Sequence, residues 1–311
     1  MIDVIEQNIA DVSPDLLKLL LTDKTTGHNI IWATDNYEKY GEEYEANREI
    51  LPELIIGRNT HIIQPRVSKA LVEQTQRTRD RAEVFTPSWV CNEQNNLVDE
   101  AWFSKKNVFN RSRDHAWKAT KKPVSFPAGK TWQDYVDARR LEVSCGEAPY
   151  IVSRYDSVSG KTIELSERVG LLDRKLRVVN ENADSADEWN KWTRRAFESV
   201  YGYEYQGDNV LLARENLLLS YIEYYTQRFD KKPTLAETQK IANVISWNIW
   251  QMDGMTFLPP NCEEDSPYEQ ITFTLFSEST PKVSVPCITY DWRARCKVEF
   301  RSLMNGGRNH G

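Results

Sequence analysis

Acidic and glycine residues end two predicted strands in a pattern that suits the binding of a nucleoside-containing cofactor. Glu142 ends the first strand and is followed by a turn with Cys145 and Gly146, and Glu204 ends the second strand. In a doubly wound sheet, a glycine lets the first turn approach a ligand, and an acid at the end of the second strand holds ribose hydroxyls. We therefore expect these residues to meet beyond the carboxyl ends of neighbouring strands.

Two further segments carry residues that suit the same site, and each also has a simpler explanation. Phe85-Thr86-Pro87 precedes the first strand, and Asp253 follows a third predicted strand. Thr86-Pro87 also suits a plain helix start, because a proline there has no N–H to leave unpaired. Asp253 with Gly254 also suits a tight turn. The sequence leaves both explanations open.

The order of these segments resembles the cofactor-binding half of the adenine-specific DNA methyltransferases of restriction-modification systems. The strongest single match is the stretch 200–217, where an acid ends a strand and a helix with Ala-Arg-Glu-Asn-Leu follows. The resemblance covers about residues 65 to 305. It implies the α/β, Rossmann-like fold of a methyltransferase that uses S-adenosylmethionine as its cofactor. The matching segments are 83–87, 141–146, 201–204 and 251–253.

The resemblance also implies roles for individual residues. Thr86 and its neighbours would line the methionine end of S-adenosylmethionine, Glu204 would hold the ribose, and Asp253 would receive the adenine amino group of the cofactor. The implied cofactor site consists of Phe85, Thr86, Pro87, Glu142, Cys145, Gly146, Glu204 and Asp253.

Two parts of the family pattern are altered in this chain. The family's second glycine is Ala148, so a side chain is expected where the backbone should approach the ligand. The Asn/Asp-Pro-Pro-aromatic segment, which grips a base flipped out of the duplex, has no intact copy. Its two approximations begin at Asp265 and Asn305, which are the candidate catalytic residues. The altered segment favours an alternative, a catalytically inactive protein of this fold that binds DNA or a protein partner.

Basic residues gather in two stretches, although the whole chain carries a net charge of -6. Lysine and arginine neutralise phosphates, so both stretches are candidate DNA contacts. A solvated charged helix face is the alternative explanation. The first stretch contains Arg66, Lys69, Arg77, Arg79 and Arg81, and the second contains Lys105, Lys106, Arg111, Arg113, Lys118, Lys121 and Lys122.

Composition excludes several other classes of protein. The five cysteines have no paired short spacing, and only four histidines are present, which argues against a zinc ribbon, a disulfide scaffold or a metal centre. The apolar run 17–21 is far shorter than the roughly 20 residues of a membrane span. The chain shows no signal peptide, no phosphate-binding loop and no nucleophile elbow, so we expect a cytoplasmic protein.

Strands that alternate with long helices predict a mostly parallel sheet covered on both faces. We expect an N-terminal α/β extension over 1–64 and a methyltransferase-like domain over 65–311, with a second subunit to supply target recognition. Residues 104–130 are expected to form a surface loop, and 150–165 a hairpin. Helices are predicted over 65–80, from 87, over 184–197 and 208–228, and from 234, and strands over 29–32, up to 142, and over 199–203, 250–252, 271–276 and 283–290.

Overall fold

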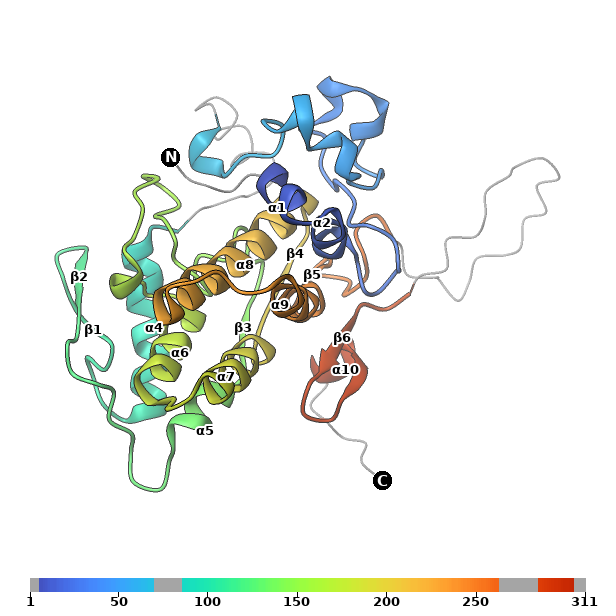
Figure 1. The fold of residues 1–311 in the computed structure, drawn as a ribbon. Helices are drawn as coiled ribbons and strands as arrows, with labels where there is room; N and C mark the ends of the chain where they lie inside the picture. The colour runs from blue at the N-terminus through green and yellow to red at the C-terminus, as the bar shows by residue number, and fades with distance from the viewer. Residues whose placement is uncertain (1–5, 70–85, 263–284, 305–311) are drawn as a thin grey trace, which may run out of the picture.

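A computed structural model describes residues 6–69, 86–262 and 285–304 of the chain. The chain mixes helix and sheet, as the sequence predicts. A parallel sheet of three strands lies at its centre: β3 (Arg140–Glu142), β4 (Val200–Glu204) and β5 (Ile249–Gln251) (Figure 1). These three strands were predicted.

The parallel register brings the carboxyl ends of all three strands to one edge of the sheet. Glu142 pairs with Gly202, and Glu204 pairs with Gln251. The spatial order β3-β4-β5 follows the order along the chain, so each connection crosses back over the sheet through helices. One half of a doubly wound fold has this topology.

Helices fill both crossover connections of the sheet. Between β3 and β4 lie α6 (Leu171–Asn182) and α7 (Ala186–Glu198), and between β4 and β5 lie α8 (Gly207–Phe229) and α9 (Leu235–Asn248). The other α-helices among the described residues are α1 (Glu6–Val12), α2 (Pro14–Leu21), α4 (Ser88–Phe103), α5 (Trp132–Asp137) and α10 (Phe300–Met304). Short 3-10 helices span Glu38–Tyr40, Glu42–Tyr44, Pro52–Leu54, Gly57–Asn59, Arg66–Ser68 and Leu165–Glu167.

The sequence predicted capping residues for α8 and α9, and only the prediction for α9 is confirmed. Thr234 and Glu237 form a capping box at α9, as predicted. Asp208 does not cap α8, because Gln206 holds the cap position and Asp208 lies in the first turn. There Asp208 is fully buried and accepts hydrogen bonds from Tyr37 (2.6 Å) and Lys69 (3.1 Å).

A C-terminal unit packs against the face of the sheet that carries Tyr203 and Trp250. This unit contains the hairpin of β6 (Ile288–Asp291) and β7 (Cys296–Glu299), and then α10. Phe300 packs with Tyr203 and Trp250 in a small second core. The predicted strand 283–290 is therefore β6, with a later start and end, and the predicted strand 271–276 lies outside the described residues.

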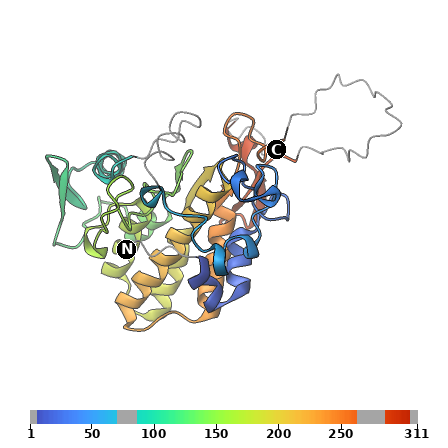
Figure 2. The ribbon, with the colours of Figure 1, turned by 90° about the horizontal axis from the view of Figure 1, so that it is seen from above.

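Two segments differ from the predicted elements. The predicted loop 104–130 contains a hairpin of β1 (Asn110–Arg113) and β2 (Ala116–Ala119), which lies far from the C-terminal unit in both views (Figures 1 and 2). The predicted hairpin over 150–165 is reduced to a single bridge between Tyr155 and Thr162.

The N-terminal residues pack against the open side of β5. The predicted strand over 29–32 contributes only isolated bridges, at Asn29 and Ile31. The side-chain amide of Gln251 accepts from Ile31 N–H (2.9 Å) and donates to Ile31 C=O (2.8 Å), as a neighbouring strand would. Residues before 64 belong to the same hydrophobic core as α8 and α9, and the domain boundary at 64 stays a prediction.

Helices α1 and α8 each bury a carboxyl group, and the two groups interact electrostatically. Glu6 and Glu215 are both fully buried, and their oxygens have no hydrogen-bond partner in the described part of the chain. Burial raises the pKa of Glu6 to about 8. Burial also raises the pKa of Glu215 well above its usual value, and the charge of Glu6 adds to this.

This pair should make the protein less stable as the pH rises. A carboxyl group with a raised pKa binds its proton more tightly in the folded state, so its contribution is complete below the unfolded pKa of 4.5 and is lost towards about 8. The free energy of unfolding should fall by up to about 1.4 kcal/mol per pH unit for each proton in this window. Urea melts from pH 5 to 8.5 should show a flatter profile for Glu215→Gln. The exposed control Glu93→Gln should keep the slope of the natural protein, and an unchanged slope in Glu215→Gln would contradict this account.

Candidate functional site

The turn after β3 is joined to the end of β4 by two hydrogen bonds. Cys145 N–H donates to Tyr203 C=O (2.8 Å), and Gly146 N–H donates to the Glu204 carboxylate (2.9 Å). The sequence predicted that Gly146, Glu204 and Asp253 would converge on one pocket. The structure brings Gly146 and Glu204 together at the carboxyl edge of the sheet, where Glu142 also lies.

The Glu204 carboxylate is held by backbone N–H groups from two turns. Its second oxygen accepts from Tyr205 N–H (2.9 Å) and Gln206 N–H (3.2 Å), directly before α8 begins at Gly207. Hydrogen bonds to an ionised carboxylate are among the stronger kinds in proteins. Glu204 therefore fixes the turn after β3 relative to the start of α8.

Glu142 occupies a different environment at the neighbouring strand end. It is buried, and one of its carboxyl oxygens accepts from Tyr150 N–H at 3.3 Å. Burial raises the pKa of Glu142 well above its usual value, and the nearby charge of Glu204 raises it further. Glu142 thus favours the neutral acid and supports the loop at Tyr150.

The turn between β3 and Tyr150 keeps a glycine-like backbone in spite of its alanine. Gly146 has a φ of 52° and Ala148 a φ of 61°, both in the left-handed region that favours glycine. Ala148 is fully buried, so its methyl group does not project into open space beside the turn. The backbone follows a glycine path although the sequence has an alanine.

Cys145 contributes packing to this turn. Its side chain is buried against Gly202 of β4, where an added Cβ would lie 3.1 Å from the Cys145 sulfur. Burial raises the pKa of the Cys145 thiol well above its usual value, with contributions from Glu142 and Glu204. The thiol is therefore structural.

Glu147 is a buried residue of the turn that the sequence did not single out. Its carboxylate accepts from Arg66 N–H and from the Tyr155 hydroxyl, each at 2.6 Å. Its backbone carbonyl accepts from the Asn216 side chain of α8 at 3.2 Å. A glutamate between glycine and alanine gave no signal of burial, because glutamate is normally exposed.

The segment at Thr86 and Pro87 starts α4, as the simpler explanation proposed. Pro87 is the cap residue, and Ser88 N–H donates to the Asp156 carboxylate at 2.7 Å. Thr86 C=O accepts from the Ser157 hydroxyl at 2.8 Å. Phe85 lies outside the described residues.

Asp253 follows β5 and forms a tight turn. Met252 N–H donates to Glu204 C=O (3.0 Å), which places Asp253 at the same sheet edge. The Asp253 carboxylate accepts from Met255 N–H at 2.7 Å, and its carbonyl accepts from Phe257 N–H at 2.8 Å. The turn explanation is therefore satisfied, and the position at the strand end also agrees with the cofactor hypothesis.

Three other predicted site residues have different outcomes. The candidates Asp265 and Asn305 lie outside the described residues. Lys69, predicted as part of a DNA-binding stretch, is buried in an ion pair with Asp208 (3.1 Å), so that part of the prediction is wrong. A lysine buried beside an acid is stabilised by the opposite charge and cannot reach a phosphate.

Comparison with known proteins gives no relative for this chain. No protein-family model, no curated protein and no solved structure matches it.

Removing the Glu204 carboxylate should loosen the turn after β3. Glu204→Ala leaves three buried or half-buried N–H groups without an acceptor, which should cost about 1–3 kcal/mol in the free energy of unfolding. Asp253→Ala, which disturbs a single local turn, should cost less. Chemical denaturation of both variants measures this, and equal losses would show that Glu204 has no special structural role.

Proposed function

We propose that this chain is the S-adenosylmethionine-binding part of an adenine-specific DNA methyltransferase of a restriction-modification or phage-defence system. The observation that carries the proposal is the hydrogen bond from Gly146 to Glu204 across two parallel strands. It joins the glycine turn and the acid that a doubly wound fold uses for a nucleoside, at the sheet edge where such ligands bind.

The residues at this edge fit such a cofactor. The left-handed backbone at Gly146 and Ala148 supports a turn that a ligand can approach closely. Glu204 would hold the ribose hydroxyls, Asp253 would receive the adenine amino group, and the segment at Thr86 would lie at the methionine end. The cofactor would supply the methyl group for direct transfer to an adenine amino group.

The outer edge of β3 supports the need for a second subunit. Arg140 N–H donates to Ser199 C=O on the β4 side, so the N–H and C=O of Leu141 point away from the sheet. The described residues supply no partner strand there, and the side chains of Leu141 and Val143 are 43% and 59% exposed. In the doubly wound order, the second half of the sheet begins beside this strand. A partner that pairs here would complete the cofactor crevice.

The alternative is an inactive protein of this fold that binds DNA or a partner. It is favoured by the absence of an intact Asn/Asp-Pro-Pro-aromatic segment. None of the helices in the described ranges has the length and apolar character to cross a membrane.

Calorimetric titration with S-adenosylhomocysteine tests the cofactor proposal. The natural chain should bind, and Glu204→Gln should weaken binding at least tenfold, about 1.4 kcal/mol, because a charged acceptor for the ribose is removed. Glu93→Gln, an exposed glutamate on α4, is the matched control and should bind like the natural chain. Circular dichroism confirms that each variant is folded. Equal affinity in Glu204→Gln and the natural chain would remove the cofactor assignment.

The isolated chain should transfer little or no methyl group to DNA. A base-modifying enzyme must extrude and grip its target, and the gripping segment is altered here. Incubation with tritiated S-adenosylmethionine and adenine-containing single-stranded or duplex DNA measures this. Robust incorporation by the chain alone would show that the segment at Asp265 or Asn305 works as the catalytic motif, and substitution of each would identify which.

A further inference from the structure

The β1–β2 hairpin carries a groove that we call the basic groove. It has a volume of about 670 Å³, and no acidic residue lines it. Among the described residues, only Lys106 of its cations has an ion pair, with the half-buried Glu100 at 3.6 Å. The cations that line it are Lys105, Lys106, Arg111, Lys118, Lys121 and Lys122.

The sequence predicted this stretch as a surface loop and a candidate DNA contact, and the structure gathers its cations around one groove. Arg111 and Lys118 stand opposite each other in the hairpin register. Both are exposed, in a chain whose net charge is negative. Like charges in one concave surface repel one another, and a polyanion relieves that repulsion.

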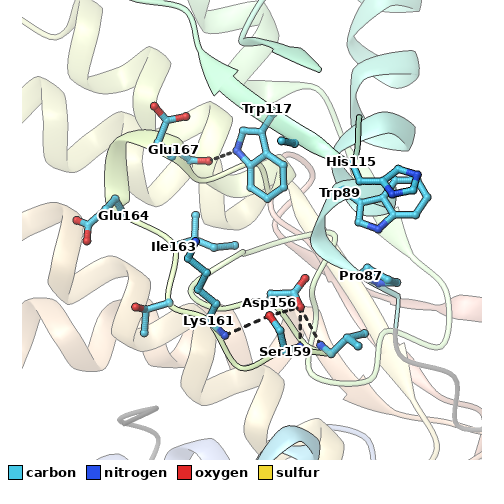
Figure 3. A pocket seen from close by; sticks show the side chains of 13 residues that line it. Pro87, Trp89, His115, Trp117, Asp156, Ser159, Lys161, Ile163, Glu164 and Glu167 are labelled. Atoms are coloured by element: carbon cyan, nitrogen blue, oxygen red, sulfur yellow. Dashed lines mark hydrogen bonds between the residues drawn. The ribbon is translucent and has the colours of Figure 1, made fainter. Parts of the chain in front are cut away.

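A second cavity, the tryptophan cavity, lies beside the same hairpin (Figure 3). It has a volume of about 640 Å³ and is lined by Trp89 of α4 and Trp117 of β2, with Pro87 and Ile163. The Trp117 ring points into this cavity, and its N–H donates to Glu167 C=O at 2.7 Å. This bond fixes the ring in place without occupying its faces.

The Trp89 ring is held by a stacking contact. His115, at the hairpin turn, stacks on it with ring centroids 3.9 Å apart and an angle of 19° between the planes. Two rigid indole rings from different elements therefore border one cavity. Such rings bind flat heterocycles at a low cost in conformational entropy.

Two of the acids at this cavity are engaged in holding the protein together. The Asp156 carboxylate accepts from the N–H groups of Ser88 (2.7 Å) and Ser159 (2.7 Å). The Glu167 carboxylate accepts from Ala119 N–H at 2.7 Å. The N–H dipoles partly offset the negative charges of these two carboxylates, which favours an uncharged ring in the cavity.

We propose that the β1–β2 hairpin binds single-stranded nucleic acid, with phosphates in the basic groove and an unpaired base in the tryptophan cavity. Lys118 lines the groove and the preceding residue, Trp117, lines the cavity on the opposite face of the hairpin, so a bound strand would pass over the hairpin edge to reach both. A charged groove combined with aromatic rings is how proteins hold single strands, since every base has a flat face. A base paired in a duplex cannot enter such a cavity. This site shares Pro87 with the proposed cofactor site, but Lys118, Lys121 and Trp117, which the tests change, lie outside that site, so the proposal is tested independently of cofactor binding.

Fluorescence anisotropy with labelled thymine- and adenine-containing 12-mers tests this proposal, using single-stranded DNA, the same sequence as duplex, and RNA. The natural chain should bind a single strand more tightly than the duplex. Whichever of the DNA and RNA single strands binds more tightly is the nucleic acid that the site prefers. Lys118→Glu with Lys121→Glu should weaken binding at least tenfold and reduce the salt slope by about 0.7 for each phosphate that is no longer neutralised. Reversal of the exposed Lys231 and Lys240 is the matched control and should have a much smaller effect.

The base-binding residue has its own variants. Trp117→Ala should weaken binding about fivefold or more with an unchanged salt slope, because stacking contributes about 1–3 kcal/mol per base. Trp117→Phe keeps a ring and should restore part of the affinity even if the alanine variant folds poorly. Equal binding of duplex and single strand, equal effects of the control reversal, or full affinity in a folded Trp117→Ala would each overturn the proposal.

Discussion

The carboxylate of Glu204 holds together the edge of the sheet at which the proposed cofactor site lies. It accepts hydrogen bonds from the N–H groups of Gly146, Tyr205 and Gln206, and so joins the turn after β3 to the start of α8. Parallel strands present their carboxyl ends together, but only a fixed turn gives these ends a defined surface. The roles proposed for Gly146 and Asp253 depend on this arrangement.

Two further buried acids, Glu147 and Asp208, stabilise this edge of the sheet. Glu147 ties the turn to Arg66 and Tyr155, and Asp208 ties the first turn of α8 to Tyr37 and Lys69. A buried charge that loses its partner is costly, so these contacts make the position of the turn specific. The N-terminal segment is therefore part of the framework that positions the site.

Elements with a local signal could be predicted from the sequence. The capping box at Thr234 gave the start of α9, and Glu204 marked the end of β4. Helix α6 was missed because its buried face includes Arg174 and Lys175, which look like surface residues in the sequence. Lys175 is buried by donating to Val136 C=O and Ser199, partners that become visible only in the fold. The hairpin of β1 and β2 was missed because its strands are polar.

The arrangement of the turns at the sheet edge was predicted in part for the same reason. Gly146 and Glu204 have residue types that a strand end and a turn require, so their meeting followed from the parallel order. Glu147 could not be predicted, since its burial depends on Arg66, which is distant in the sequence, and on the fold of the loop that carries Tyr155. The glycine-like path at Ala148 also ran against its residue type.

Hydrogen exchange measured with and without S-adenosylhomocysteine tests the central claim most directly. The account predicts that the ligand slows exchange together in three segments, at Gly146, at Tyr205 and Gln206, and after Asp253, because one ligand would cover the ends of three strands. Protection confined to other parts of the chain, or no change at saturating ligand, would contradict the proposed cofactor site.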